Sequence, residues 1–178
     1  MRCLLFAMVL SVASSVAGCT PSNYRLCDTY GDWNEIVSGC SSFIAEGGVS
    51  DYNLAAAHHN RGTAYENLGQ CKLAIEDFNV AISLLPGSPH PYLNRGHALA
   101  SLGNYPPALE DFERSMKLEG APRVRFWQTW TRSHGGYYTG PINGVYDPEI
   151  LVAIEACLRD QACRDNEWTC LDKAESIN

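Results

Sequence analysis

Residues 59–69 read HNRGTAYENLG, and residues 93–103 read LNRGHALASLG. The two stretches share Asn-Arg-Gly, an alanine and a closing Leu-Gly at equivalent positions, 34 residues apart. The same spacing continues downstream, where Ala74, Phe78 and Ala81 correspond to Ala108, Phe112 and Ser115. A repeat at this period indicates one small structural unit used at least twice, and it decides the fold.

Gly, Tyr, Gly, Ala, Phe, Ala and Pro stand at fixed offsets within this period, and the pattern resembles the tetratricopeptide repeat, a helix–turn–helix unit. The resemblance implies an all-α stack of helical hairpins over residues 32–120 that presents a surface to a protein partner. Gly62 and Gly96 are expected to let paired helices approach closely. The predicted hairpin helices cover residues 52–68, 71–84, 90–102 and 105–118.

An amphipathic helix is predicted before the first full repeat. Trp33, Ile36, Val37 and Cys40 follow the i, i+3, i+4, i+7 pattern of one helix face, and the pattern runs on to residue 44. Two glycines at residues 47–48 indicate its end. We interpret it as the second helix of an incomplete first repeat, which gives about two and a half repeats.

The last third of the chain carries a different pattern. Residues 136–138 (GYY) and 140–144 (GPING) form a turn-rich loop, and further matches are Val124, Trp127-Gln128, Trp130, Tyr146 and Pro148. Residues 123–158 thereby resemble the small three-helix peptidoglycan-binding domain. The resemblance implies such a domain over residues 122–178, with a third helix around residues 166–173. Asp147 stands where that family has Gly, and we expect it to cap the helix that Pro148 opens.

Wall-binding residues are predicted in the same segment. Arg123, Arg125 and Arg132 are not balanced by a carboxylate there, and arginine forks suit the carboxylates of stem peptides. The candidate peptidoglycan contacts are Arg125, Trp127, Arg132, Tyr137, Tyr138, Asn143 and Tyr146. The alternative is that the tryptophans are core, the tyrosines brace the loop and the arginines are solvated. Gly140 and Gly144 suit positive φ.

A groove for a protein partner is implied by the tetratricopeptide resemblance. Its candidate residues on the first helices of the repeats are His59, Thr63, Glu66, Asn67, His90 and His97. Members of this family that grip a C-terminal carboxylate use Lys or Arg in the groove, and these positions hold neither. The partner is therefore left unspecified, and a structural role or self-association is the alternative.

The N-terminus resembles an export signal over residues 1–18. Arg2 precedes an apolar run that is too short to span a bilayer. Val16-Ala17-Gly18-Cys19 resembles the lipobox of bacterial lipoproteins, which implies a lipid on Cys19 and a tether over residues 19–31. The resemblance predicts a periplasmic lipoprotein, with Thr20 favouring the outer membrane, held to the membrane only through its lipid. Ordinary cleavage after Ala17 is the alternative.

The cysteines favour disulfides, because an exported chain folds in an oxidising compartment. Cys27 and Cys40 bracket a short polar segment and form the preferred pair. A second bridge is expected among Cys157, Cys163 and Cys170. Cys71 remains open, with a buried free thiol as the alternative.

Several function classes are disfavoured. The formal charge of −7 argues against a nucleic-acid partner. The sequence lacks His-Glu-x-x-His, paired Cys-x-x-Cys, Gly-x-Ser-x-Gly and phosphate-loop motifs, so we predict no metal, no cofactor and no enzyme activity. The predicted function is a non-catalytic adaptor that contacts peptidoglycan and a protein. The alternatives are a scaffold whose C-terminal part only caps the stack, and an accessory subunit of a cell-wall hydrolase.

Overall fold

The computed structural model of the 178-residue chain describes Cys27 and residues 31–160. The regular elements of this part are all helices, which confirms the predicted all-α class. They are α1 (Trp33–Glu46), α2 (Asp51–Asn67), α3 (Cys71–Leu84), α4 (Pro89–Ser101), α5 (Tyr105–Glu119), α6 (Ala121–Ser133) and α7 (Glu149–Arg159).

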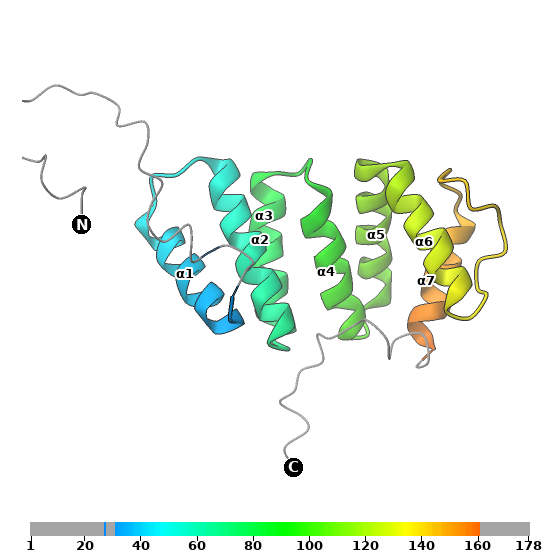
Figure 1. Ribbon diagram of the computed structural model, residues 1–178, viewed down its shortest axis with the longest axis horizontal. Coiled ribbons are helices and arrows are strands. Elements are labelled where there is room, and N and C mark those ends of the chain that lie inside the picture. Colours follow the sequence, from blue (N-terminus) through cyan, green and yellow to red (C-terminus); the bar gives the residue numbers. More distant parts are fainter. Residues whose placement is uncertain (1–26, 28–30, 161–178) are drawn as a thin grey trace, which may run out of the picture.

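The helices stack side by side along the longest axis of the molecule, from α1 at one end to α6 and α7 at the other (Figure 1). The hairpins α2–α3 and α4–α5 are the two repeats, and α3 also packs against α4 of the next hairpin. Helix α1 packs against α2, as expected for the second helix of an incomplete first repeat. The period of 34 residues therefore corresponds to one helical hairpin of the stack.

Local sequence sets the helix ends. The carboxylate of Asp32 accepts a hydrogen bond from the Asn34 amide at 2.9 Å and begins α1. Gly47 ends this helix with φ of +64°, and Gly120 ends α5 with φ of +78°. Both glycines thus provide the left-handed backbone that favours a helix stop.

The repeat glycines serve close packing between the helices of each hairpin. A methyl group on Gly62 would lie 2.7 Å from Cε1 of Phe78, and one on Gly96 would lie 2.6 Å from Cε1 of Phe112. Both phenylalanines are fully buried. The expectation that these glycines permit close helix approach is confirmed.

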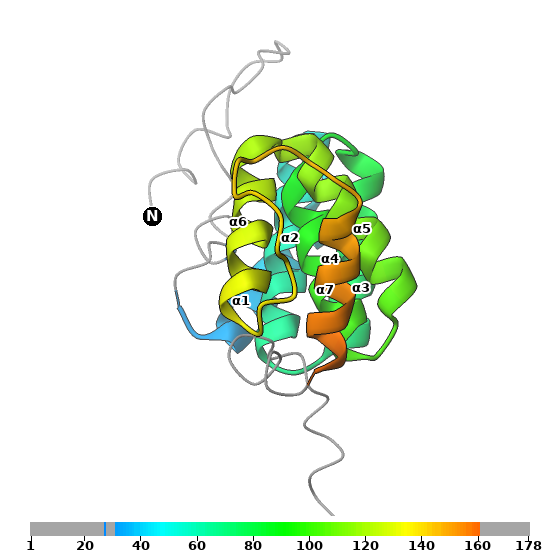
Figure 2. The ribbon, with the colours of Figure 1, turned by 90° about the vertical axis from the view of Figure 1, so that its right-hand side faces the viewer.

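The C-terminal helices share one hydrophobic core with the second repeat. Phe112 and Met116 of α5 belong to the same buried cluster as Trp127 of α6 and Ile154 of α7. The ring centroids of Phe112 and Trp127 lie 4.8 Å apart. Figure 2 looks onto this end of the stack, where residues 134–148 cross from α6 to α7.

Two details of the C-terminal segment differ from the predictions. Asp147 does not cap α7, which begins at Glu149 after Pro148; its carboxylate instead accepts a hydrogen bond from the Tyr138 hydroxyl at 2.7 Å. Gly144 has the predicted positive φ of +76°, but Gly140 does not have a positive φ. Gly140 is required for space, because a methyl group there would lie 2.6 Å from the Tyr138 hydroxyl oxygen.

Several predicted features lie outside the described residues. They are the signal over residues 1–18, the lipidated Cys19, the tether apart from Cys27 and Gly31, the helix around residues 166–173, Cys163 and Cys170. Among the described helices, none has the length and hydropathy needed to cross a membrane.

Candidate interaction surfaces

Each repeat contains a buried arginine–aspartate pair that joins its two helices. Arg61 of α2 donates from Nε and Nη2 to Asp77 of α3, at 2.7 and 2.8 Å. Arg95 of α4 makes the same two bonds to Asp111 of α5, at 2.8 and 2.7 Å. Burial alone would raise the pKa of Asp77, but hydrogen bonds from Arg61 and His58 lower it below its ordinary value. The carboxylate therefore stays charged inside the stack.

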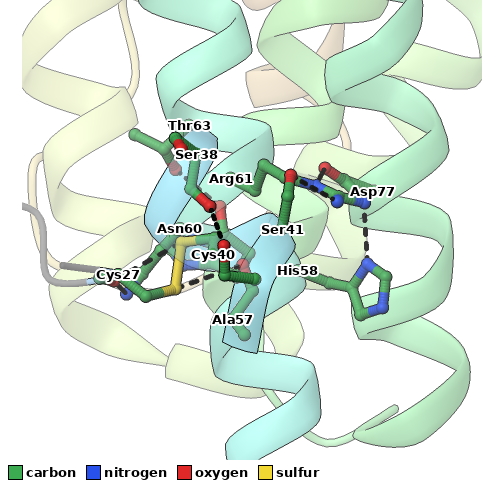
Figure 3. The surroundings of a disulfide bond; sticks show 12 residues. Cys27, Ser38, Cys40, Ser41, Ala57, His58, Asn60, Arg61, Thr63 and Asp77 are labelled. Carbon is green, nitrogen blue, oxygen red and sulfur yellow. Dashed lines mark hydrogen bonds and ion pairs between the residues drawn. A yellow bond between two sulfur atoms is a disulfide. The ribbon is translucent and has the colours of Figure 1, made fainter. Parts of the chain in front are cut away.

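The same arginines also reach the preceding hairpin. Arg61 donates from Nη1 to the Ser41 hydroxyl of α1 at 3.0 Å, and Arg95 donates from Nη1 to the side-chain oxygen of Asn79 on α3 at 2.6 Å. Figure 3 shows Arg61 between Ser41 and Asp77. Sequence reasoning missed these contacts, although Arg-x15-Asp recurs at the period of 34 residues.

The predicted disulfide between Cys27 and Cys40 is present and anchors the chain beside α1 and α2 (Figure 3). Asn60 of α2 donates to the Cys27 carbonyl at 2.7 Å, which fixes Cys27 against the first repeat. Cys71 and Cys157 are disulfide-bonded as well, so the free-thiol alternative for Cys71 is wrong.

A strip of half-buried polar side chains runs between α2 and α4. Asn94 of α4 donates from Nδ2 towards Thr63 Oγ1 of α2 at 3.2 Å, and the same nitrogen lies 3.2 Å from His59 Nε2. Asn67 donates to the Thr63 carbonyl at 2.8 Å within its own helix. The structure thus brings His59, Thr63 and Asn67 to one helix face that borders α4. We call this strip, with Glu66 and His90, the groove.

Glu66 has an unusual position in the groove. Its carboxyl forms no hydrogen bond or ion pair with another side chain in the part of the chain that the structure describes, and the residue is half-buried. Burial raises its pKa to about 8. A neutral carboxyl is therefore favoured at pH 7 unless a counter-charge approaches.

The two other groove candidates differ in environment. His90 is exposed, and its ring centroid lies 6.4 Å from that of His59. His97 lies against aromatic core, with its ring 5.4 Å from Phe112 and 6.3 Å from Trp127. Burial, followed by the charge of Arg123, lowers the pKa of His97 to about 3, so this ring is a neutral packing element.

One end of the groove contains a pocket of about 120 Å³ between the two repeats. Its walls come mainly from small and aliphatic residues, together with the rings of His59 and His90. The lining residues are Tyr52, Ala55, Ala56, His59, Ala81, Leu85, Ser88, His90 and Pro91. The pocket can hold an apolar side chain.

Gln128 organises the loop of residues 134–148 from inside. Its side-chain oxygen accepts from the amides of Asn143 and Gly144 at 3.2 and 3.0 Å. Its side-chain nitrogen donates to the Tyr138 hydroxyl at 3.2 Å and to the Val145 carbonyl at 3.0 Å. The loop is therefore held by one fully buried amide.

Most of the predicted peptidoglycan contacts serve this packing. Trp127 and Tyr138 are buried and offer no face to a ligand, so the alternative applies to both: Trp127 belongs to the core and Tyr138 braces the loop. Arg132 donates to the carbonyls of Tyr138 and Gly140. The hydroxyl of Tyr137 donates to Asp160.

The other two loop candidates also have partners within the protein. The Tyr146 hydroxyl donates to Glu113 of α5 at 2.5 Å. Asn143 is exposed, and its side-chain oxygen accepts from the Val145 amide at 2.8 Å. These contacts tie the loop to itself and to the second repeat.

Arg125 is the remaining wall-binding candidate, and it is exposed on α6. Its guanidinium forms no hydrogen bond or ion pair within the described residues. It borders an open depression of about 380 Å³, whose lining is Arg125, Phe126, Thr129, Trp130 and Ser133. Arg123, by contrast, is paired with Glu119 at 2.8 Å. Of the three arginines predicted to bind the wall or to lie beside it, only Arg125 has a guanidinium without a partner among the described residues, and it lies beside the exposed ring of Phe126.

The described residues contain no group of three or more metal-binding side chains.

The tetratricopeptide repeat family model matches residues 55–86 and 89–122, which are the hairpins α2–α3 and α4–α5. The chain thus contains two tetratricopeptide repeats, a class of module that serves protein–protein interaction. No curated protein matches the chain.

Proposed function

We propose that this protein is an exported, non-catalytic adaptor. Its tetratricopeptide repeats hold a segment of a partner protein, and its C-terminal helices contact peptidoglycan. The groove between α2 and α4 is the observation that carries the proposal, since it combines half-buried polar groups with an apolar pocket. Such a surface suits an extended peptide with both backbone and side-chain contacts.

Crosslinking in intact cells followed by affinity purification tests the adaptor function. A partner crosslinked through the groove is expected to be lost with Asn94→Ala and retained with the exposed control Glu76→Gln on α3. Recovery that is unchanged by every groove substitution would contradict binding at this surface.

The wall contact is proposed at the Arg125 depression. A guanidinium without an internal partner suits a carboxylate of a stem peptide, and the exposed ring of Phe126 offers apolar surface beside it. Co-sedimentation with purified sacculi is expected to fall with Arg125→Glu. The matched control is Lys72→Glu, an exposed cation on α3. Protein that stays in the supernatant at low salt would end this part of the proposal.

Export to the periplasm and anchoring in the outer membrane through Cys19 are also proposed. The disulfide-bonded state of Cys27, Cys40, Cys71 and Cys157 supports an oxidising compartment. Incorporation of labelled palmitate should depend on Cys19. Incorporation that persists in Cys19→Ala would refute lipidation at this residue.

A scaffold whose C-terminal helices only cap the repeats is the second candidate. The hydrophobic cluster that unites α5, α6 and α7 favours it, because terminal repeats need a cover for their apolar face. The two candidates differ in wall affinity, which capping alone does not require. The third candidate, an accessory subunit of a wall hydrolase, predicts co-purification with a hydrolase and a blank zymogram for this chain by itself.

A further inference from the structure

The groove has two recognition points of different chemistry on the same face of α2. One is the apolar pocket beside His59, and the other is the carboxyl of Glu66. His59 and Thr63 both border Asn94 of α4, and Glu66 follows Thr63 by three residues on that face. The two points therefore lie along one path between the repeats.

The pocket is suited to an uncharged side chain. Ala55, Ala81, Leu85 and Pro91 contribute apolar wall. Burial is the main cause that lowers the pKa of His59, so its ring is neutral at pH 7. An apolar cavity of about 150 Å³ holds benzene. A pocket of about 120 Å³ is thus of the size for an aliphatic side chain.

The carboxyl of Glu66 is suited to a cation. It is half-buried and has no side-chain partner in the described structure, whereas the buried aspartates of both repeats are paired with arginines. Removing a carboxyl from water without a partner is unfavourable. An incoming ammonium or guanidinium group would supply the missing counter-charge.

Charge complementarity favours the same occupant. None of the groove residues His59, Thr63, Glu66, Asn67 and His90 is Lys or Arg, and the chain has a formal charge of −7. The net negative charge of the chain attracts a basic segment and repels an acidic one, and no basic side chain of the groove opposes this.

The distance between the two points sets a spacing in the ligand. The α2 residues that line the pocket run from Tyr52 to His59, and their midpoint lies about ten residues before Glu66, which corresponds to about 15 Å along a helix. An extended peptide advances about 3.3 Å per residue. About five residues of ligand therefore cover the interval.

We propose that the groove binds an extended segment of a partner protein that places an aliphatic side chain in the His59 pocket and a Lys or Arg, about five residues away, against Glu66. This inference rests on the proposed adaptor function and specifies the partner segment. The inference does not depend on the proposed wall contact at Arg125.

A displayed library of random twelve-residue peptides, selected on the oxidised protein, provides the test. Selected sequences are expected to be enriched in an aliphatic residue and a Lys or Arg about five residues apart. One selected peptide is then measured by calorimetry, together with its Lys→Gln and Leu→Ala forms. A charge-assisted contact predicts a loss of at least about tenfold in affinity for Lys→Gln.

Protein variants assign the contact to Glu66. In Glu66→Gln the difference between the Lys and Gln peptides should disappear, and Glu66→Lys should favour a peptide with Glu in place of Lys. Ala56→Leu, which narrows the pocket, should weaken every peptide with an aliphatic anchor. The control Glu76→Gln removes an exposed carboxylate of the same repeat and should leave all affinities unchanged.

The outcomes separate this inference from the proposed function. Peptides that bind the groove without a basic residue, or whose basic residue is insensitive to Glu66→Gln, would overturn the inference and leave peptide binding intact. Selection of no peptide by a protein with native circular dichroism would overturn both.

Discussion

At the scale of single residues, the repeats contain buried or half-buried carboxyl groups of two kinds, paired and unpaired. Asp77 and Asp111 each receive two hydrogen bonds from an arginine, which compensates their removal from water. Glu66 receives none from the described side chains, and its pKa rises to about 8. The paired aspartates therefore belong to the framework of the stack, while Glu66 weakens the unliganded fold.

Glu66→Gln should make this protein more stable in mildly alkaline solution. The pKa of Glu66 is about 8 in the fold against an ordinary value of 4.5. The folded state therefore binds a proton more tightly than the unfolded state, and this group destabilises the fold progressively as pH rises from about 4.5 to 8. The amide does not ionise. Urea unfolding at pH 8 should show a gain of about 1–2 kcal/mol, reduced by partial exposure.

The gain should vanish at pH 4, where the carboxyl is protonated in both states. Glu76→Gln, on the exposed face of α3, should show no such pH dependence. Equal unfolding free energies for Glu66→Gln and the parent protein at pH 8 would show that water or a counter-ion already compensates the carboxylate.

Gly96→Ala should destabilise the second repeat. The added methyl would lie 2.6 Å from a ring carbon of Phe112, which is fully buried and cannot move freely. Overpacking of this kind costs about 1–3 kcal/mol and outweighs the higher helix propensity of alanine. Thermal unfolding should give a lower midpoint. The control Gly87→Ala has no atom within 4 Å of its methyl and should be neutral; equal losses for both variants would contradict the steric reason.

The loop between α6 and α7 depends on a single side chain at the scale of elements. The glycine–tyrosine pattern correctly indicated a turn-rich loop, and Gly144 has the positive φ expected of it. The role of Gln128 was not predicted, because its five bonds join positions 10 to 17 residues away and have no local period. One of these bonds, to the Tyr138 hydroxyl, holds inside the loop a side chain that was predicted to contact peptidoglycan, and Tyr138 is buried there.

Gln128→Leu should loosen this loop without unfolding the repeats. Leucine cannot accept from the amides of Asn143 and Gly144, and a buried unsatisfied donor costs about 1–3 kcal/mol. Hydrogen–deuterium exchange should speed up at residues 138–147 and stay unchanged in α2 and α3. Thr139→Ala, an exposed change in the same loop, serves as the control. Unchanged protection at Gly144 would refute the role of Gln128.

At the scale of the whole molecule, local sequence patterns predicted the helices but not the core that they share. The helices of the repeats followed from periodicity and from glycines at fixed offsets, which are local signals. The shared core of the second repeat and the C-terminal helices did not follow from such signals, because the contact between Phe112 and Trp127 joins two segments with different sequence patterns. The boundary near residue 121 was predicted from motifs, and the core continues across it.

Removal of residues 121–178 should therefore destabilise the repeats themselves. It would expose Phe112 and Met116, which are now 0% and 1% exposed. Loss of packing around large buried side chains typically costs about 3–5 kcal/mol. Urea unfolding followed by circular dichroism should show this loss, while removal of residues 171–178 alone, which keeps every cysteine, is the control for shortening the chain. Equal stability with and without residues 121–178 would refute the capping role.

The arginine that links three helices in each repeat provides the contacts that an additional hairpin would need. Arg95 finds its partners at Asp111 ahead and at Asn79 behind, and Arg61 finds equivalents at Asp77 and Ser41. A tandem duplication of residues 55–88 would bring its own arginine, its own aspartate and a copy of Asn79 for the hairpin that follows. The stack could thus be lengthened by whole hairpins that use the same arginine contacts to their neighbours. Each inserted hairpin would extend the groove by one repeat.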